Sequence, residues 1–318
     1  MKNMKKLLCM LLALAMVLAL CACGSSTEEA ATEEAPAEEA AATEAPAEEA
    51  PAEEEVDYSA MTLDELKAVL TTVTEGKLTV ATSPDFAPYE FYAIDENGEP
   101  QLAGFDMALA AYIADYLGLE LEVIPVDFDG VLNELAAGNV DLGMAGLSPD
   151  PTRMDAMDFS DIYYQGGQSF VTVEDKVDLF PDLESANNPE YSIGAQNGSI
   201  QMDLANEFTP DADIVALVKV TDIVAELLSD KLDGAFIETA VAENYAITNP
   251  GLAVILDVPY DVEGSSVGVV KGNEALLAGV NMAIAAAIAD GSMDTFVAEA
   301  NELSTGEIIE GLLEDQAA

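Results

Sequence analysis

Residues 140–153 read VDLGMAGLSPDPTR, an apolar run that turns into a loop rich in glycine, proline and aspartate. The run Val140–Ala145 predicts a buried β-strand, and the loop Gly146–Arg153 follows its carboxyl end. Arg153 is the only arginine in a chain of 318 residues with a formal net charge of -51. Its planar guanidinium can hold a carboxylate through two parallel hydrogen bonds, which makes it the best candidate for an anion receptor. The alternative is a surface arginine paired with Asp155 or Asp158.

β and α patterns alternate around this stretch. Strand-like segments lie at 77–82 and 119–126, and helical apolar spacing is found at 105–117, before Gly118, and at 131–137. This βαβαβ order predicts a parallel sheet with helices on its faces, and ligands of such sheets bind beyond the carboxyl ends of the strands. The loops 83–89 and 146–153 both lie at such ends.

A second set of alternating elements follows the pair Gly166-Gly167 and predicts a second lobe. Its expected strands are 169–173, 191–195, 214–218, 234–237 and 254–258, and its expected helices are 200–207, 222–228 and 239–247. The chain then runs extended through 259–269 and ends in helices at 275–290 and 293–303, with a capping box of Ser304 and Glu307 opening a last helix. We expect the ends of the globular part to complete the first lobe and its middle to form the second.

The N-terminal 55 residues carry targeting signals. Residues 1–22 combine three lysines with an apolar run, which is typical of a secretory signal peptide. The sequence Leu20-Cys21-Ala22-Cys23 resembles a bacterial lipobox, so we expect lipidation of Cys23; the alternative is a signal peptide without lipidation. Residues 23–55 are rich in Glu, Ala and Pro and predict a disordered tether. In residues 56–76, a capping box of Thr62 and Glu65 predicts a lead-in helix through about Glu75, stopped by Gly76.

The composition excludes several kinds of chemistry. The three cysteines, Cys9, Cys21 and Cys23, precede the globular part, and the chain has no histidine. We therefore expect no disulfide, no cofactor, no thiolate or imidazole metal site and no catalytic residue of the cysteine or histidine type. The acidic charge argues against nucleic acid as a partner. An exported chain with these residues is expected to be a binding protein and not an enzyme.

The chain resembles the bacterial extracellular solute-binding proteins of family 3, the amino-acid-binding components of ABC importers. The resemblance covers Lys77 to Leu303 and rests on motifs in a fixed order: Thr82-Ser83-Pro84-Asp85-Phe86-Ala87-Pro88-Tyr89-Glu90-Phe91, Gly104-Phe105-Asp106, Val126-Asp127-Phe128-Asp129-Gly130, Gly143-Met144-Ala145-Gly146-Leu147-Ser148 with Arg153, and Asp158-Phe159-Ser160-Asp161 with Tyr163-Tyr164. It implies a two-lobed periplasmic-binding-protein-like fold of type II, with a mostly parallel sheet in each lobe and two hinge strands. The expected lobes are 77–165 with 260–318, and 166–259.

The resemblance also implies the ligand contacts. It places the α-carboxylate of an amino acid on Arg153, with the Gly146 amide and the Ser148 amide and hydroxyl. The segment Gln196–Ser199 leads into a helix whose amides would face the same carboxylate, and Glu238 stands where the family keeps an acid for the α-ammonium. The remaining candidates for the pocket are Phe86, Phe128, Ser83, Tyr89, Ser199, Ile200 and Gln201.

Three positions depart from the family pattern. Ser83 replaces an aspartate that is common in the glutamine binders and basic-amino-acid binders of the family, which argues against a cationic or strongly donating side chain in the ligand. Ile200 replaces a small or hydroxylated residue, so only its backbone amide is available to the carboxylate. Glu238 is one methylene longer than the usual aspartate.

These features predict a lipid-anchored receptor on the extracytoplasmic face of the cell membrane, which captures a free L-amino acid by hinge closure and delivers it to an ABC permease. Two alternatives remain open. One is an exported dehydratase-like enzyme on the same fold, with Glu238 as its general acid. The other is an amino-acid sensor that serves no transporter.

Overall fold

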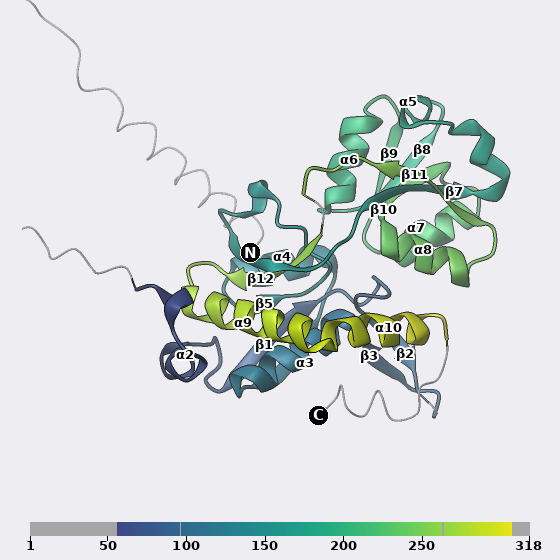
Figure 1. The fold of residues 1–318 in the computed structure, drawn as a ribbon. Coiled ribbons are helices and arrows are strands. Elements are labelled where there is room, and N and C mark those ends of the chain that lie inside the picture. The colour runs from purple at the N-terminus through teal and green to yellow at the C-terminus, as the bar shows by residue number, and fades with distance from the viewer. Residues whose placement is uncertain (1–55, 96, 263, 307–318) are drawn as a thin grey trace, which may run out of the picture. The chain divides into compact units, whose positions relative to one another are not determined.

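The computed structural model describes residues 56–306 apart from residues 96 and 263, and these described residues belong to one compact unit. The signal peptide, Cys23, the tether and the helix expected after Ser304 lie outside the described residues. Two five-stranded sheets organise the fold (Figure 1), and we call the part around the first sheet lobe 1 and the part around the second sheet lobe 2.

The strands of lobe 1 come from both ends of the described chain, and its sheet has the order β4-β1-β5-β12-β6. These strands are β1 (Lys77–Thr82), β4 (Glu120–Pro125), β5 (Leu142–Gly143), β6 (Met157–Tyr164) and β12 (Ser265–Val270). Lobe 2 has the order β11-β7-β10-β8-β9. Its strands are β7 (Gln168–Val173), β8 (Ser192–Gln196), β9 (Asp213–Leu217), β10 (Gly234–Glu238) and β11 (Leu252–Val258).

Helices connect and cover the strands of each sheet. Those of lobe 1 are α2 (Leu63–Val69), α3 (Phe105–Leu117), α4 (Phe128–Ala136), α9 (Glu274–Asp290) and α10 (Ser292–Ser304). Those of lobe 2 are α5 (Leu183–Ala186), α6 (Ile200–Phe208), α7 (Val220–Leu228) and α8 (Thr239–Thr248). Short 3₁₀ helices are η1 (Tyr58–Ala60), η2 (Pro151–Arg153) and η3 (Glu174–Leu179).

The chain crosses between the sheets twice (Figure 1). It leaves lobe 1 between β6 and β7 and returns between β11 and β12. The strands next to these crossings pair antiparallel: β12 with β5 and β6, and β7 with β10 and β11. The α/β fold with two lobes is confirmed. Each sheet has a parallel core of three strands, to which the strands at the crossings add antiparallel pairs.

The lead-in helix is shorter than predicted. The capping box of Thr62 and Glu65 is formed, but α2 ends at Val69 and Leu70 is extended. Residues 71–74 are Thr, Thr, Val and Thr, whose β-branched side chains disfavour a helix. The Val73 amide instead donates to Asp141 Oδ1 at 2.7 Å, which joins this segment to lobe 1.

Two features of lobe 1 were missed in the sequence. A hairpin of β2 (Phe91–Ile94) and β3 (Pro100–Ala103) follows the first loop, and its turn is held by Asp95 Oδ1, which accepts from the amides of Asn97 and Glu99, each at 2.8 Å. The Asn97-Gly98 pair is a turn signal that could have revealed it. Strand β6 was also not predicted, although it pairs with the expected return strand.

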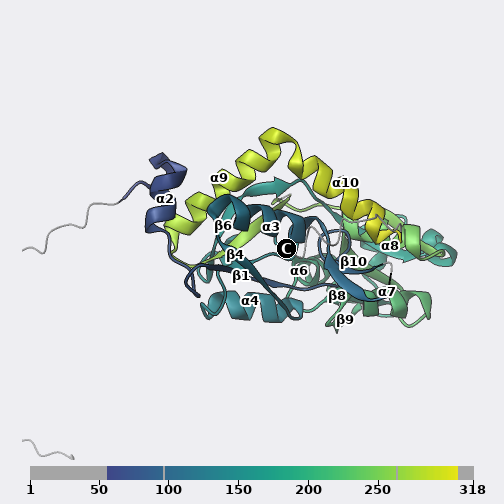
Figure 2. The same cartoon turned by 90° about the horizontal axis from the view of Figure 1, so that it is seen from below.

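The last two described helices close the first lobe. Helices α9 and α10 meet at Gly291 in a bend of 80° (Figure 2), and both pack against α3. The contact with α3 is close, because a Cβ on Gly279 would lie 2.9 Å from Leu117 Cδ2. Within residues 56–306 no single helix is long and apolar enough to cross a membrane, and only this bent pair passes by length and composition.

Candidate functional site: the cleft between the two lobes

Two loops of lobe 1 meet at the carboxyl ends of β1 and β5. Because these strands pair in parallel, the loops 83–89 and 146–153 leave the same edge of the sheet. Gly146 has φ +56°, and a Cβ there would lie 2.7 Å from the Phe86 ring. A glycine is therefore required for the ring of Phe86 to pack on the second loop.

Arg153 faces the other lobe. Its Nη2 donates to the carbonyl oxygen of Gly198 at 3.2 Å, and its guanidinium lies 5.7 Å from the centre of the Phe128 ring. Burial lowers the pKa of Arg153 from its ordinary value. Among the described residues Arg153 makes no ion pair, and Asp158 pairs with Lys271 at 2.7 Å. The alternative of a surface arginine paired with Asp155 or Asp158 is therefore wrong.

The two segments that meet at this guanidinium also carry hydrogen-bond donors without a partner. Ser148 is 7% exposed, and neither its amide nor its hydroxyl has a partner in the part of the chain that the structure describes. The same holds for the amides of Ile200 and Gln201, which open α6 directly after Gly198 and Ser199. Two lobes thus present an arginine, a serine and a helix N-terminus to one another, and this combination is suited to an anion.

Two predicted donors are already used within the protein. The Gly146 amide donates to Asp106 Oδ2 at 3.1 Å, so the group of anion donors does not include it. The Ser199 hydroxyl donates to the Gln196 carbonyl at 2.7 Å and accepts from the Met202 amide at 3.2 Å. Ser199 therefore acts as the N-cap of α6, and its contribution is to hold the helix end in place.

The other candidates on lobe 2 have mainly structural contacts. The side chain of Ile200 is buried in the lobe 2 core and only its amide is free. Gln201 Nε2 donates to Gln168 Oε1 at 2.8 Å, which links α6 to the start of β7 at the crossing. The side chain of Gln201 is thus turned to the crossing.

The two aromatic candidates of lobe 1 have different neighbours. Phe86 is 7% exposed and packs on Tyr89, with ring centres 5.4 Å apart. Phe128 is 8% exposed and lies beside Arg153. The hydroxyl of Ser83 donates to Asp85 Oδ1 at 2.8 Å, so this candidate too has a partner in its own loop.

Glu238 ends β10 and lies beside Tyr89 from the opposite lobe. Its Oε1 accepts from the Tyr89 hydroxyl at 3.1 Å, and its Oε2 accepts from the Val241 amide at 2.9 Å, which caps α8. Glu238 is 3% exposed, and burial raises the pKa of its carboxyl to about 7. Gly166 at the first crossing makes room, because a Cβ there would lie 2.7 Å from Glu238 Oε1.

Sequence reasoning missed a pair of buried acids behind the two loops. Asp106 accepts from the Tyr163 hydroxyl at 2.6 Å, and burial raises its pKa to about 6. Glu90 is fully buried, and its oxygens have no hydrogen-bond partner among the described residues. Burial, and next to it the neighbouring Asp106, raise the pKa of Glu90 well above its usual value, because both disfavour the charged form of its carboxyl. Both residues belong to sequence motifs that carry the family resemblance but had been given no structural role.

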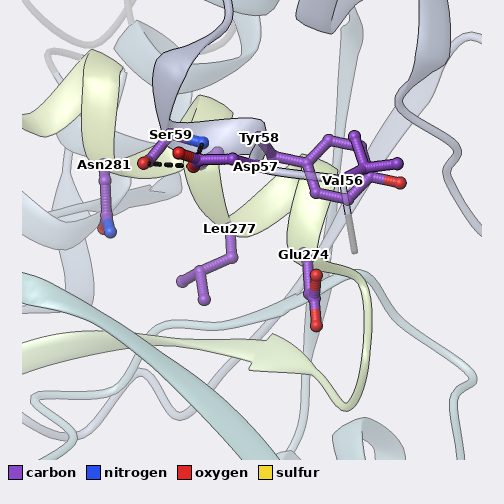
Figure 3. A pocket seen from close by; sticks show the side chains of 8 residues that line it. Val56, Asp57, Tyr58, Ser59, Glu274, Leu277 and Asn281 are labelled. Atoms are coloured by element: carbon purple, nitrogen blue, oxygen red, sulfur yellow. Dashed lines mark hydrogen bonds between the residues drawn. The ribbon is translucent and has the colours of Figure 1, made fainter. Parts of the chain in front are cut away.

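One cavity touches the predicted site and another does not. One of about 330 Å³ is lined by Ser83, Asp85 and Asp127 of lobe 1 and by Val218 and Lys219 of lobe 2. The other, of about 250 Å³, lies between residues 56–59 and α9 (Figure 3) and contains none of the predicted site residues. Within the described ranges no cluster of three or more acids could hold a metal ion.

Two α/β lobes that meet around an arginine and free backbone amides define a two-lobed solute-binding protein. The chain belongs to the bacterial extracellular solute-binding proteins, family 3, whose model matches residues 78–299. The description of the family as extracellular places the protein on the extracytoplasmic side of the membrane.

Three known proteins illustrate the range of the relatives. The arginine-binding extracellular protein ArtP of Bacillus subtilis is 34% identical over 203 residues, which are 62% of this chain and 76% of ArtP. An amino acid ABC transporter substrate-binding protein of Streptococcus pneumoniae, solved with L-arginine, is 33% identical with a TM-score of 0.68, over 76% of this chain and 98% of that one. Cyclohexadienyl dehydratase of Pseudomonas aeruginosa is 27% identical over 187 residues, 58% of this chain and 68% of the enzyme.

Proposed function

We propose that this protein is the substrate-binding component of an ABC importer, and that it captures a free L-α-amino acid between its lobes for delivery to a membrane permease. The observation that carries the proposal is the convergence of Arg153 and Ser148 from lobe 1 with the free amides of Ile200 and Gln201 from lobe 2. The four groups are donors, and all belong to the surfaces that face each other across the cleft. They would hold the α-carboxylate of the ligand.

The other end of the zwitterion would meet Glu238. This carboxyl is buried beside Tyr89, and an ammonium ion next to it would stabilise its charged form. Charge-assisted bonds at both ends, with the ligand side chain between Phe86 and Phe128, are sufficient for a micromolar dissociation constant, or about -8 kcal/mol. Closure of the lobes would remove both ends of the ligand from water.

We further propose arginine as the first ligand to test. ArtP is named for arginine, and the S. pneumoniae structure contains L-arginine. Two buried acids, Asp85 and Glu238, lie at contacts between the lobes and in their ionised form favour a cationic ligand. Ser83 in place of aspartate argues against a cationic or strongly donating side chain, so apolar and other neutral amino acids belong in the same screen.

The proposed location is the outer face of the cell membrane. A lipid on Cys23 would anchor the protein, and the acidic residues 23–55 would hold the lobes away from the anionic lipid surface. Incorporation of radiolabelled palmitate into the wild-type chain, and its loss in Cys23→Ala, would test the anchor. Equal incorporation in both proteins would exclude Cys23 as the site.

A dehydratase is the second candidate, because one relative is a cyclohexadienyl dehydratase and because Glu238 has the pKa of about 7 that suits a general acid. The assay is formation of phenylpyruvate from prephenate by the purified chain. Turnover that disappears in Glu238→Gln would replace the binding function by an enzymatic one. We expect no turnover, since a dicarboxylate substrate prefers more than the one guanidinium that this chain contains.

A thermal-shift screen against the free L-amino acids tests the main proposal. We expect a raised melting temperature with a few amino acids in the wild type and none in Arg153→Ala. Lys271→Ala is the matched control, because it also removes one positive charge but from an exposed pair with Asp158. It should keep the ligand-dependent shift, and a shift retained in Arg153→Ala would contradict the proposal.

A further inference from the structure

Helix α7 of lobe 2 begins without a cap from its own lobe. Its N-cap residue is Lys219, whose side chain makes no capping hydrogen bond and contains no acceptor. The first amides of a helix have no partner within the helix, and the helix dipole gives this end a partial positive charge. Among the first residues of α7, Val220 is buried, so its amide needs an acceptor from elsewhere in the protein.

The acceptor comes from lobe 1. Asp85 Oδ2 accepts from the Val220 amide at 2.6 Å and from Gln196 Nε2 at 3.4 Å. The backbone carbonyl of the same residue accepts from the Tyr245 hydroxyl at 2.9 Å. One residue of the first loop of lobe 1 therefore binds β8, α7 and α8 of lobe 2.

The carboxylate is oriented by its own loop. Ser83 donates its hydroxyl to Asp85 Oδ1 at 2.8 Å, and the Asp85 amide donates to the Ser83 carbonyl at 2.8 Å. Burial raises the pKa of Asp85, and the bonds from Val220 and Ser83 lower it, so these bonds oppose the cost of removing the charge from water. The loop thus presents a preformed acceptor to lobe 2.

We propose that Asp85 is a closure latch, a positioning residue that caps α7 across the cleft and thereby stabilises the closed arrangement of the lobes. Separation of the lobes would break all three contacts of Asp85 with lobe 2, while the bonds with Ser83 would remain. The latch is separate from the proposed carboxylate contacts, since Arg153 and Ser148 stand on the other loop of lobe 1, whereas Phe86, a proposed contact of the ligand side chain, directly follows Asp85. The closed fraction without ligand therefore tests the latch apart from ligand binding.

This role deepens the proposed function and rests on it only for the effect on ligand affinity. A ligand that binds the closed form has an apparent affinity proportional to the closed fraction of the protein. Loss of a charge-assisted bond at this site should reduce the ratio of closed to open molecules about tenfold, which corresponds to about 1.4 kcal/mol. Affinity should fall by a similar factor wherever the open form predominates.

Spin-label distances can measure the latch. The chain from Glu55 onward belongs to one compact unit and lacks cysteine, so Asn133→Cys on α4 and Glu207→Cys on α6 place one label on an exposed position of each lobe. Pulsed electron–electron double resonance would give the closed fraction of this doubly labelled protein, which is the reference, and of the same protein with Asp85→Ala or Asp85→Asn. Each would be measured without ligand and across a titration with L-arginine.

We expect a smaller closed fraction in Asp85→Ala at zero or subsaturating arginine, and an intermediate value in Asp85→Asn, which keeps an oxygen for the Val220 amide. Asp182→Ala is the matched control, because this carboxylate caps α5 inside its own lobe, and its distances should equal those of the reference. Distances that are the same in Asp85→Ala and the reference at every arginine concentration would overturn the latch. Failure of the proposed function would instead appear as a reference protein that does not respond to arginine.

Discussion

Three helices of lobe 2 begin after the parallel strands β8, β9 and β10, and they differ in how their first amides are satisfied. Helix α8 is capped by Glu238 and α6 by Ser199, both from their own lobe. Helix α7 is capped by Asp85 from lobe 1. Only α6 also meets an arginine from the opposite lobe, and the amides of Ile200 and Gln201 stay free there among the described residues.

The difference separates three tasks that begin with the same local structure. A helix start with its own acidic cap brings an ionisable carboxyl to the cleft, as Glu238 does for α8. A helix start without a cap in its own lobe can be capped by a residue of the facing lobe, so that this bond exists only when the lobes are closed, as we propose for α7. A helix start whose cap leaves amides open can receive an anionic ligand, as we propose for α6.

The largest expected effect concerns the anion at α6. Replacing Arg153 by alanine should weaken the binding of the ligand amino acid about a hundredfold or more, because charge-assisted bonds to a buried carboxylate are lost. Arg153→Lys should recover part of this loss, since the charge remains but the planar fork does not. Isothermal titration calorimetry of the wild type and the two variants measures the three affinities. Equal affinity in Arg153→Ala and the wild type would break the assignment of α6 as the anion site.

The next effect concerns the acid at α8. With a pKa of about 7, Glu238 is largely neutral at pH 6 and largely ionised at pH 8, and an ammonium ion binds the ionised form. Affinity should therefore rise about tenfold between these pH values, and binding near pH 7 should release a proton. Glu238→Gln should abolish this rise. The measurement is a set of titrations in buffers of different ionisation enthalpy, and a pH dependence that is unchanged in Glu238→Gln would exclude this acid.

The same group makes an independent prediction for stability without ligand. Its pKa is raised on folding from the ordinary value of 4.5 to about 7, so the folded protein holds the proton more tightly than the unfolded chain. Stability should fall as the pH rises from 4.5 to 7, by up to about 3 kcal/mol from this group. Urea unfolding at several pH values should show a smaller fall in Glu238→Gln. Parallel curves for the two proteins would contradict the raised pKa.

The smallest expected effect on affinity concerns the cap of α6. Ser199→Ala should cost about 1 kcal/mol of folding stability, because the cap of the Met202 amide is lost. Affinity should change less than about threefold, since the Ser199 hydroxyl is bonded within lobe 2 and not to the proposed ligand. Urea unfolding measures the folding stability of the variant, and calorimetry measures its ligand affinity. A large loss of affinity with unchanged stability would make Ser199 a direct ligand contact.

Local signals predicted the elements that have clear ends. Helix Phe105–Leu117 was predicted to its last residue because Gly118 adopts a left-handed conformation, which ends the helix as glycine commonly does. The end of α2 was placed too late, since Gly76 was taken as the stop of the helix, whereas the β-branched residues Thr71, Thr72 and Val73 already disfavour one. Arg153 could be selected because no other arginine competes with it.

Contacts between distant segments could not be read in the same way. Asp85 and Val220 are 135 positions apart, and nothing near either residue in the sequence indicates a capping bond between them. The Gly146 amide looked available as an anion donor until the fold placed Asp106 against it. The pKa of Glu238 likewise depends on burial beside the opposite lobe, which no local pattern encodes.

The central claim is that the α-carboxylate of the ligand binds at Arg153 and the start of α6. The most direct test compares, by calorimetry, the affinity for the amino acid found in the thermal-shift screen with the affinity for its decarboxylated amine. For arginine this amine is agmatine. We expect binding of the amine to be weaker by about a hundredfold or more, with no further loss in Arg153→Ala, because the amine has no group for the guanidinium. Equal binding of the amine and the amino acid would contradict the claim.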